Sequence, residues 1–219
     1  MNRRGLILSL LSLGIVGFGG ATWYARRSTP VVQATPPTPV VNEALIRSYS
    51  PILGPEDAPV TIVEFFDPAC EACRAFYPVV KEIMEKYPSE VRVVIRYTPF
   101  HGPISETSIK LMEAARMQGQ YDQVMNALMV YQDAWASHGT SNMQKIGQIA
   151  QGAGLDLELA LEQIKSPDIV AIFNQDKADV DTLGVNQTPT FFINGKPLDP
   201  FGRDELRQQV DAAVAQVSG

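Results

Sequence analysis

Cys70 and Cys73 are the only cysteines in this chain of 219 residues, and two residues, Glu71 and Ala72, separate them. A run of apolar residues typical of a buried strand precedes the pair, and helical spacing of apolar residues follows it. A thiol at such a junction would lie at a helix N-terminus, where unpaired N–H groups and the helix dipole stabilise a thiolate. A second thiol close by could resolve a mixed disulfide. The spacing therefore favours thiol–disulfide exchange.

The same pair could instead form a fixed structural disulfide or half of a metal site. A disulfide that closes so short a loop removes little entropy from the unfolded chain, so it would add little stability. A closed zinc site normally needs four ligands. The only two histidines, His101 and His138, are expected to lie far from the cysteines and lack ligand-like spacing. We therefore predict no metal and no cofactor.

Glu64 is the one charged residue in the apolar run Val60–Phe66. An ionised carboxylate inside a central strand is costly unless it is paired, so we expect Glu64 to hold its proton more tightly than in water. It is then a candidate proton acceptor for Cys73, directly or through a water, as a mixed disulfide resolves. The alternative is a glutamate at an edge, neutralised by a nearby lysine or arginine.

The elements that must position these groups form a strand–helix–strand unit. Val60–Phe66 is almost continuously apolar, which is typical of a central strand covered on both faces. Helical spacing runs from Glu71 to about Tyr87, and Pro78 is expected to kink this helix. Val91–Tyr97 is predicted as a second strand. The short return between the strands makes a right-handed parallel unit the default.

Residues 105–183 have helical spacing with several stop signals, and we expect about five helical segments there. Asp156 is suited to cap one helix, and Ser166 followed by Pro167 is suited to begin the last. Strand character returns at Thr190–Ile193. Asn194-Gly195 is then a hairpin signal, and Lys196–Leu198 is a short strand whose proline suits a sheet edge. The chain closes with an amphipathic helix at Arg203–Val217.

This order of elements resembles the DsbA-like branch of the thioredoxin superfamily over about residues 43–217. Besides the cysteine pair, Thr188-Pro189 matches the family's cis-proline element. Glu64, six residues before the first cysteine, matches the buried acid beneath the active site, and Pro78, five residues after the second, matches the proline of the kinked helix. The resemblance implies a thioredoxin-like α/β fold with a helical insertion.

The resemblance also implies roles for the site residues. Cys70 is the nucleophile, or the sulfur attacked when the enzyme is oxidised, and Cys73 is the resolving thiol. Thr188 and Pro189 hold substrate backbone by strand-like pairing. Glu64 manages the proton.

Two departures from the family pattern leave the direction of electron flow open. The best-studied oxidases carry proline and histidine between the cysteines, where this chain has Glu71 and Ala72. Losing a cationic neighbour and gaining an acid disfavours the Cys70 thiolate. An enzyme whose reduced form is less stable is a weaker oxidant. Glu71 and Ala72 are thus predicted to tune the redox potential. Thr188, before the cis-proline, is closer to isomerase and reductase relatives than to the strong oxidases.

The first 27 residues are predicted to be a signal anchor or a signal peptide. Arg3 and Arg4 precede an uncharged run at residues 6–25, which is long enough to cross a bilayer and longer than a usual signal-peptide core. Trp23 and Tyr24 would suit the membrane interface, so we favour an anchor over cleavage. The chain is predicted to divide into five segments. The anchor or signal is residues 1–27, and a proline-rich spacer and domain entry is residues 28–59. A first thioredoxin-like half (60–104), the helical insertion (105–184) and a second thioredoxin-like half (185–219) follow.

The chain is expected to act at the extracytoplasmic or periplasmic face of the membrane, as an oxidoreductase that exchanges disulfides with exported proteins and with a membrane redox partner. After residue 27 it carries 14 basic and 24 acidic residues, which argues against binding to nucleic acid. The alternatives are an isomerase or reductase kept reduced by a membrane electron donor, and a metal-binding or chaperone module that is not an enzyme.

Overall fold

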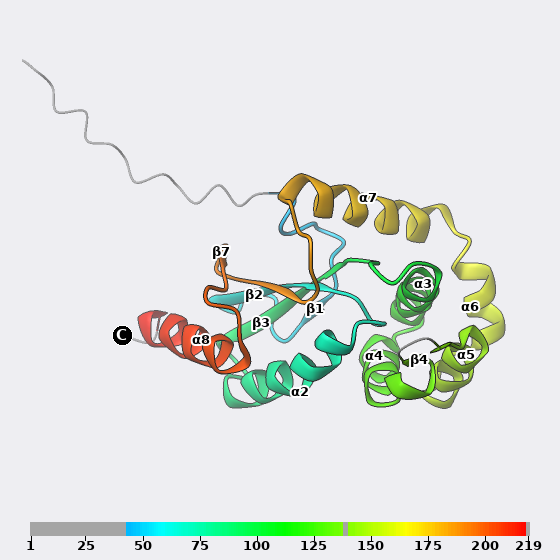
Figure 1. Cartoon of the computed structure of the whole chain (residues 1–219), viewed down its shortest axis with the longest axis horizontal. Coiled ribbons are helices and arrows are strands. Elements are labelled where there is room, and N and C mark those ends of the chain that lie inside the picture. Colours follow the sequence, from blue (N-terminus) through cyan, green and yellow to red (C-terminus); the bar gives the residue numbers. More distant parts are fainter. Residues whose placement is uncertain (1–42, 138–139, 218–219) are drawn as a thin grey trace, which may run out of the picture. The chain divides into compact units, whose positions relative to one another are not determined.

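The computed structural model describes residues 43–137 and 140–217, which contain a mixed five-stranded sheet with the order β1-β3-β2-β6-β7 (Figure 1). Strands β2 and β3 are parallel, and the other neighbouring strands are antiparallel. The strands are β1 (Ile52–Leu53), β2 (Val60–Phe66), β3 (Val91–Tyr97), β6 (Thr190–Ile193) and β7 (Lys196–Pro197).

Helices cover both faces of this sheet, as Figure 1 shows. Helices α2 (Glu71–Lys86) and α8 (Arg203–Val217) lie on one face, and α7 (Pro167–Leu183) lies on the other. Helix α2 continues through Pro78, so the predicted kink at that residue stays a prediction. Two layers of helix around a central sheet bury it on both sides, which explains the continuous apolar sequence of β2.

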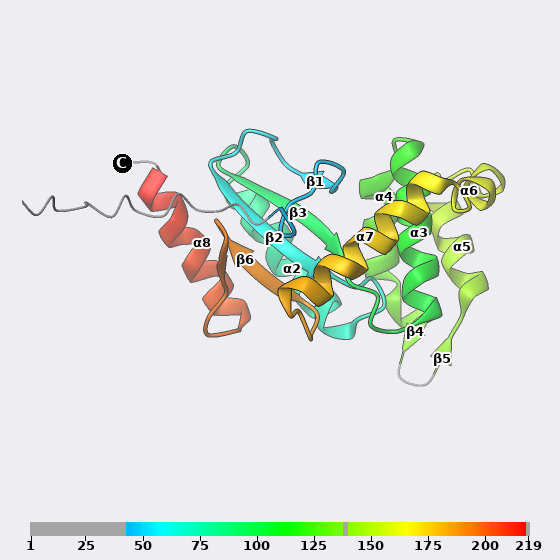
Figure 2. The same cartoon turned by 90° about the horizontal axis from the view of Figure 1, so that it is seen from above.

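The helical insertion follows β3 and lies beyond one end of the sheet, from which α7 runs back across the sheet (Figure 2). Five α-helices between residues 103 and 183 confirm the predicted number, and the side chains of Asp156 and Ser166 cap α6 and α7 as predicted. A two-stranded pair, β4 and β5, was not predicted because each strand has only two residues. The insertion contains α3 (Pro103–Met117), α4 (Tyr121–Val130), the 3₁₀ turn η1 (Gln132–Ala134), β4 (Ala136–Ser137), β5 (Thr140–Ser141), α5 (Met143–Gly152) and α6 (Leu157–Gln163).

Strand β2 contacts two separate hydrophobic clusters, because alternate side chains of a strand point to opposite faces. Ile62 and Phe66 belong to the larger cluster, which includes α2 and α8, whereas Val63 packs with Val180 of α7 in the smaller one. By the same alternation Glu64 faces the side of α2. The anomalous charge in this strand is therefore directed toward the helix that carries the cysteines.

A buried ion-pair cluster fixes α7 to the sheet. Arg96 of β3 is fully buried, and its Nη2 lies 2.8 Å from Asp176 and 2.6 Å from Asp179, both on α7. Arg47 and Tyr49, from the segment that leads into β1, contact the same two carboxylates at 2.7 Å. The cluster joins three separate parts of the chain: the domain entry, β3 and α7.

Most of the predicted strands and helices are confirmed, including the parallel pairing of β2 with β3 and the position of β7 at the sheet edge. The short strand β1 was missed, because two residues show no periodicity. The predicted anchor or signal at residues 1–27 lies outside the described residues, as does most of the spacer. Within the described ranges, no helix combines the length and apolar character that a membrane span requires.

Candidate functional site

Cys70 stands at the start of α2, where β2 has just ended. Its N–H donates to the carbonyl of Asp67 at 3.0 Å, and its own carbonyl accepts from the N–H of Arg74 at 3.1 Å as the first turn begins. Cys70 is 7% exposed, whereas Cys73 is fully buried one turn later. Cys70 thus keeps a small contact with solvent that Cys73 lacks.

The two thiols differ strongly in acidity. The hydrogen bond with the Cys73 side chain lowers the pKa of Cys70 from 9.0 to about 5, with help from the backbone N–H groups of Cys73 and Ala72, although burial acts in the opposite direction. Burial raises the pKa of Cys73 well above its usual value, and the negative charges of Cys70 and Glu64 add to this effect. The reduced pair therefore holds one thiolate, on Cys70, at neutral pH.

Thr188 and Pro189 face the cysteines from the segment that precedes β6. The Thr188–Pro189 peptide bond is cis, as predicted, and the Cys70 Sγ lies 3.3 Å from the Thr188 carbonyl oxygen. A second cis bond, at Asp199-Pro200, was not predicted, because nothing distinguishes its sequence from an ordinary turn. The sheet thus brings together the two predicted halves of the site, the cysteine pair and the proline element.

Glu64 lies beneath the cysteines, 2% exposed. Burial first, and the negative charge of Cys70 second, raise the pKa of Glu64 to about 8. Within the described ranges, no lysine or arginine forms an ion pair with it, which argues against the alternative of a neutralised edge glutamate. The carboxyl is therefore largely protonated at neutral pH.

A cavity of about 240 Å³ extends from Glu64 toward the surface between α2 and α4. At its polar side the Tyr77 hydroxyl and the Lys81 Nζ lie 3.3 Å and 3.4 Å from Oδ1 of Asn126. Lys81 is exposed, so the lining includes both the buried acid and a surface residue. A cavity of this size with several polar groups has room for water beside Glu64.

Asp67 is a site residue that the sequence analysis missed. Its carboxylate is fully buried and accepts hydrogen bonds from the N–H groups of Ala69, Phe100 and His101, at 2.9, 2.9 and 3.2 Å, and from the Ser105 hydroxyl at 2.9 Å. The Asp67 N–H lies 3.5 Å from the Cys73 Sγ. Its position three residues before the first cysteine could have signalled this role.

His101 also lies at the site, and the expectation that it is distant from the cysteines is wrong. Its Nδ1 is 2.7 Å from Asp67 Oδ2. The physical reason is that β2 and β3 are parallel, so the loops after both strands meet at one edge of the sheet. The other histidine, His138, lies outside the described residues.

Gln132 is another site residue that was not predicted, and no local sequence pattern marks it. It is fully buried in η1, and its Nε2 donates to the carbonyls of Pro68 at 2.7 Å and Cys70 at 3.0 Å. The next residue, Asp133, forms an ion pair with Arg74 in the first turn of α2. The insertion thus holds the active-site loop through two neighbouring residues.

The residues between the cysteines occupy the exposed side of the helix start. Glu71 is half-buried and Ala72 is exposed in the first turn of α2.

Among the described residues, no group of three or more histidine, cysteine, aspartate or glutamate side chains is arranged to hold a metal ion. The arrangement that does exist can carry out nucleophilic exchange at Cys70, with proton transfer near Cys73.

A thioredoxin-like sheet that directs an acidic thiol toward a cis-proline places the chain in the class of thioredoxin-like proteins. The chain belongs to the Thioredoxin family, whose sequence model matches residues 47–212. A thioredoxin-like oxidoreductase from Silicibacter pomeroyi is 32% identical, with a TM-score of 0.68 over 78% of this chain and 96% of that one. Alpha-DsbA1 of Wolbachia pipientis has the same fold, with a TM-score of 0.68, 21% identity and coverage of 78% and 94%.

Curated relatives include much longer proteins. The Na(+)/H(+) antiporter NhaA of Herminiimonas arsenicoxydans is 31% identical over 149 residues, which are 67% of this chain and 22% of that protein. The chain spans only about a quarter of the length of the curated relatives it matches, 22–28%. The likeness to these relatives therefore concerns one part of each of them.

Proposed function

We propose that the chain exchanges disulfides with cysteine-containing proteins, and that Cys70 is the sulfur that forms the mixed disulfide. The observation that carries this proposal is the contrast between the two thiols: Cys70 has a pKa of about 5 and some exposure, whereas Cys73 is buried with a raised pKa. A thiolate is the reactive form in exchange, so the accessible sulfur is also the reactive one.

In the oxidising direction, a substrate thiolate attacks the Cys70 sulfur of the Cys70–Cys73 disulfide. A bond forms between the substrate and Cys70, the enzyme's S–S bond breaks, and Cys73 takes the electron pair. A second substrate thiolate then attacks the substrate sulfur of the mixed disulfide and expels Cys70 as a thiolate. The substrate loses two electrons and the enzyme gains them. The reducing direction is the reverse of these steps.

Glu64 is the proton carrier for Cys73. A thiolate at a fully buried position is costly, so Cys73 must gain a proton as it leaves and lose it before it attacks. With a pKa of about 8, Glu64 can supply or accept this proton near neutral pH. The cavity beside Glu64 allows the carboxyl to exchange its own proton with water.

Thr188 and Pro189 bind the substrate backbone on either side of the reacting cysteine. The Thr188 carbonyl is within hydrogen-bonding distance of Cys70 Sγ, and it belongs to the segment that becomes β6. An extended substrate segment that pairs with this backbone would bring its own sulfur to Cys70.

The acidity of Cys70 supports a redox potential between those of two reference proteins. The nucleophilic cysteine has a pKa of about 7 in thioredoxin and about 3.5 in DsbA, and Cys70, at about 5, lies between them. We therefore expect a reduction potential between about −270 and −120 mV. A value at the thioredoxin end supports the reductase or isomerase alternative.

We further propose that exchange takes place outside the cytoplasm, at the extracytoplasmic or periplasmic face of the membrane, with exported proteins as substrates and a membrane protein as redox partner. The apolar run at residues 6–25 and the reducing conditions of the cytoplasm support this location. Thiol trapping in cells would reveal the redox state of the pair. A mostly reduced pair would favour the reductase alternative.

Exchange itself is tested by replacing each cysteine with serine. Cys70→Ser should abolish turnover of a model disulfide substrate, whereas Cys73→Ser should retain attack and accumulate a mixed disulfide. The mixed disulfide is detected by mass spectrometry of the intact protein. Turnover that survives Cys70→Ser would overturn the proposal.

A further inference from the structure

We propose that His101, held by Asp67, supplies the positive charge for the Cys70 thiolate that the residues between the cysteines do not supply. This inference rests on the proposed function, since it concerns the same exchange reaction. It makes His101 a positioning residue that acts on Cys70 through charge.

Asp67 joins the histidine to the cysteines. Its backbone carbonyl accepts from the Cys70 N–H at 3.0 Å, and its backbone N–H lies 3.5 Å from the Cys73 Sγ. Its carboxylate oxygen Oδ2 lies 2.7 Å from the His101 Nδ1. His101 is thus separated from the reacting sulfurs by a single residue.

The loop after β3 is built to hold His101 in this place. The N–H groups of Phe100 and His101 and the hydroxyl of Ser105 all donate to Asp67 Oδ2, the same oxygen that receives the ring. Gly102 follows with a positive φ of 70°, which turns the chain into α3. The side chain of His101 is 45% exposed, so part of the ring is in contact with solvent.

The charges around His101 favour its protonated form. The hydrogen bond with Asp67 raises the pKa of His101, and the negative charges of Asp67, Cys70 and Glu71 act in the same direction. The cation on α2 nearest in sequence to these groups, Arg74, already forms an ion pair with Asp133. Protonated His101 is therefore available to balance the negative charge at the site.

Without this positive charge, the carboxylate of Asp67 would stand uncompensated beside the cysteines. A like charge disfavours ionisation of a neighbouring thiol, and a cation favours it. Glu71 adds a further acid, and Ala72 adds no charge. His101 thus offsets the buried aspartate, and it does so from the loop that follows β3.

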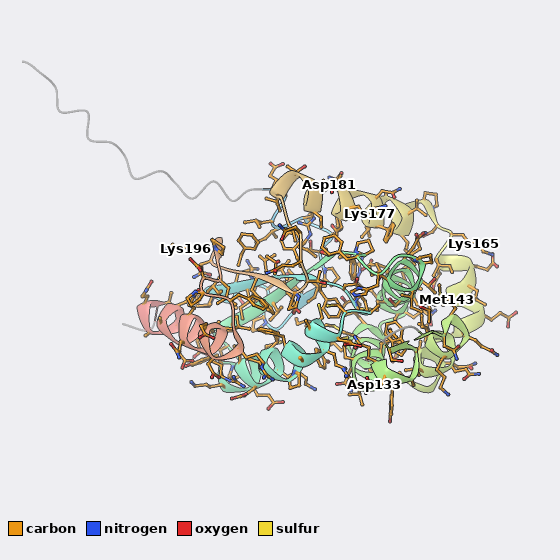
Figure 3. All side chains as sticks on the ribbon, in the orientation of Figure 1. Asp133, Met143, Lys165, Lys177, Asp181 and Lys196 are labelled. Carbon is orange, nitrogen blue, oxygen red and sulfur yellow. The ribbon has the colours of Figure 1, made fainter. Side chains whose placement is uncertain are left out.

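A purely structural role for His101 would require only its hydrogen bond to Asp67. The variant His101→Gln separates the two roles, because the glutamine amide can donate a hydrogen bond but carries no charge. His101→Lys restores a cation. Lys165→Gln, which removes a cation from the outer part of the insertion (labelled in Figure 3), is the matched control.

The experiment measures two properties of each full-length variant. The first is the pKa of Cys70, from thiolate absorbance, and the second is the equilibrium constant with oxidised and reduced glutathione. His101→Gln should raise the pKa of Cys70 by about one unit and lower the oxidising equilibrium constant about tenfold, equivalent to about 30 mV. His101→Lys should keep both near the wild-type values, and Lys165→Gln should change neither.

The pH dependence gives an independent readout. The wild type and His101→Gln should differ below the pKa of His101, and their equilibrium constants should converge above it, where the wild-type ring is neutral. Equal Cys70 pKa values in wild type and His101→Gln would overturn the inference while exchange continues. If the wild type itself does not exchange disulfides, the proposed function fails instead.

Discussion

The side-chain amide of Gln132 donates a hydrogen bond of 3.0 Å to the carbonyl of Cys70, across 62 positions of sequence. The same nitrogen donates to Pro68 at 2.7 Å. A residue of the helical insertion therefore sets the backbone geometry of the loop that carries the reactive sulfur. The insertion, which lies beyond one end of the sheet, therefore contributes a residue to the candidate site.

Replacing Gln132 with methionine should loosen the active-site loop. The side chain keeps its length, but the buried carbonyl of Pro68 loses its donor, which costs about 1–3 kcal/mol. We expect a lower midpoint in urea and a several-fold loss of exchange activity. Gln148→Met, at an exposed position on α5, is the control. Unchanged stability and activity in Gln132→Met would contradict a net contribution of this side chain to the fold and the site.

Replacing Glu64 with glutamine should change how stability depends on pH. Folding raises the pKa of Glu64 to about 8, so the folded state holds a proton that the unfolded state releases above about pH 4.3. The contribution of Glu64 is thus complete below that pH and is lost as pH rises through 8. At pH 8, Glu64→Gln should be more stable than the wild type, by on the order of 2–4 kcal/mol.

The pH dependence of wild-type stability alone does not isolate Glu64, because Cys70 changes the stability with pH in the opposite direction. Folding lowers the pKa of Cys70 to about 5, so its contribution to stability grows as pH rises. Urea melts of both proteins at pH 4 and pH 8 isolate the effect of Glu64. A difference in stability that does not depend on pH would contradict a protonated buried glutamate.

In the reducing direction, where Cys70 first attacks a substrate disulfide and Cys73 then attacks Cys70, Glu64→Gln should also slow the second step without changing the first. Glutamine cannot carry the proton of Cys73, so resolution of the mixed disulfide should slow about 10²-fold or more. Formation of the mixed disulfide at Cys70 should keep most of its rate. Rapid mixing followed by acid quench resolves the two steps, and an equal slowing of both would argue for a general structural defect.

Replacing Arg96 with methionine should destabilise the fold strongly. Arg96 is fully buried between Asp176 and Asp179, and its loss leaves these carboxylates with less compensation. Removing one partner of a buried ion pair costs about 3–5 kcal/mol. Arg207, which is partly exposed and paired with Glu82 at the surface, is a suitable control, since Arg207→Met should cost much less than Arg96→Met. Similar losses for both variants would contradict a special role for the buried cluster.

The features of the candidate site whose positions agree with the prediction are those with a local signature. The strand–helix junction at Cys70, the isolated acid at Glu64 and the motif Thr188-Pro189 can each be recognised within a few residues. Asp67 and His101 could not be paired from local sequence, because their contact depends on parallel strands that end at the same edge. The parallel pairing was predicted, but the contact of the loop at residues 98–102 with Asp67 was not.

Gln132 and Arg96 show a different limit. A glutamine near the end of an amphipathic helix has no local signal that distinguishes it from a surface residue, and its role depends on how the insertion packs. Arg96 interrupts an apolar strand much as Glu64 does, yet one is neutralised by two aspartates and the other retains its proton. The partners on α7, about 80 residues later in the chain, decide between these outcomes.

The pairing of β2 with β6 has a consequence for the order in which the protein is made. Thr188 lies 118 residues after Cys70, so at 5–20 residues per second the ribosome adds it on the order of ten seconds later. Until then β2 has β3 beside it but lacks its other neighbour, and the cysteines lack the backbone that faces them. The two facing parts of the site are therefore present together only after the whole helical insertion has been made.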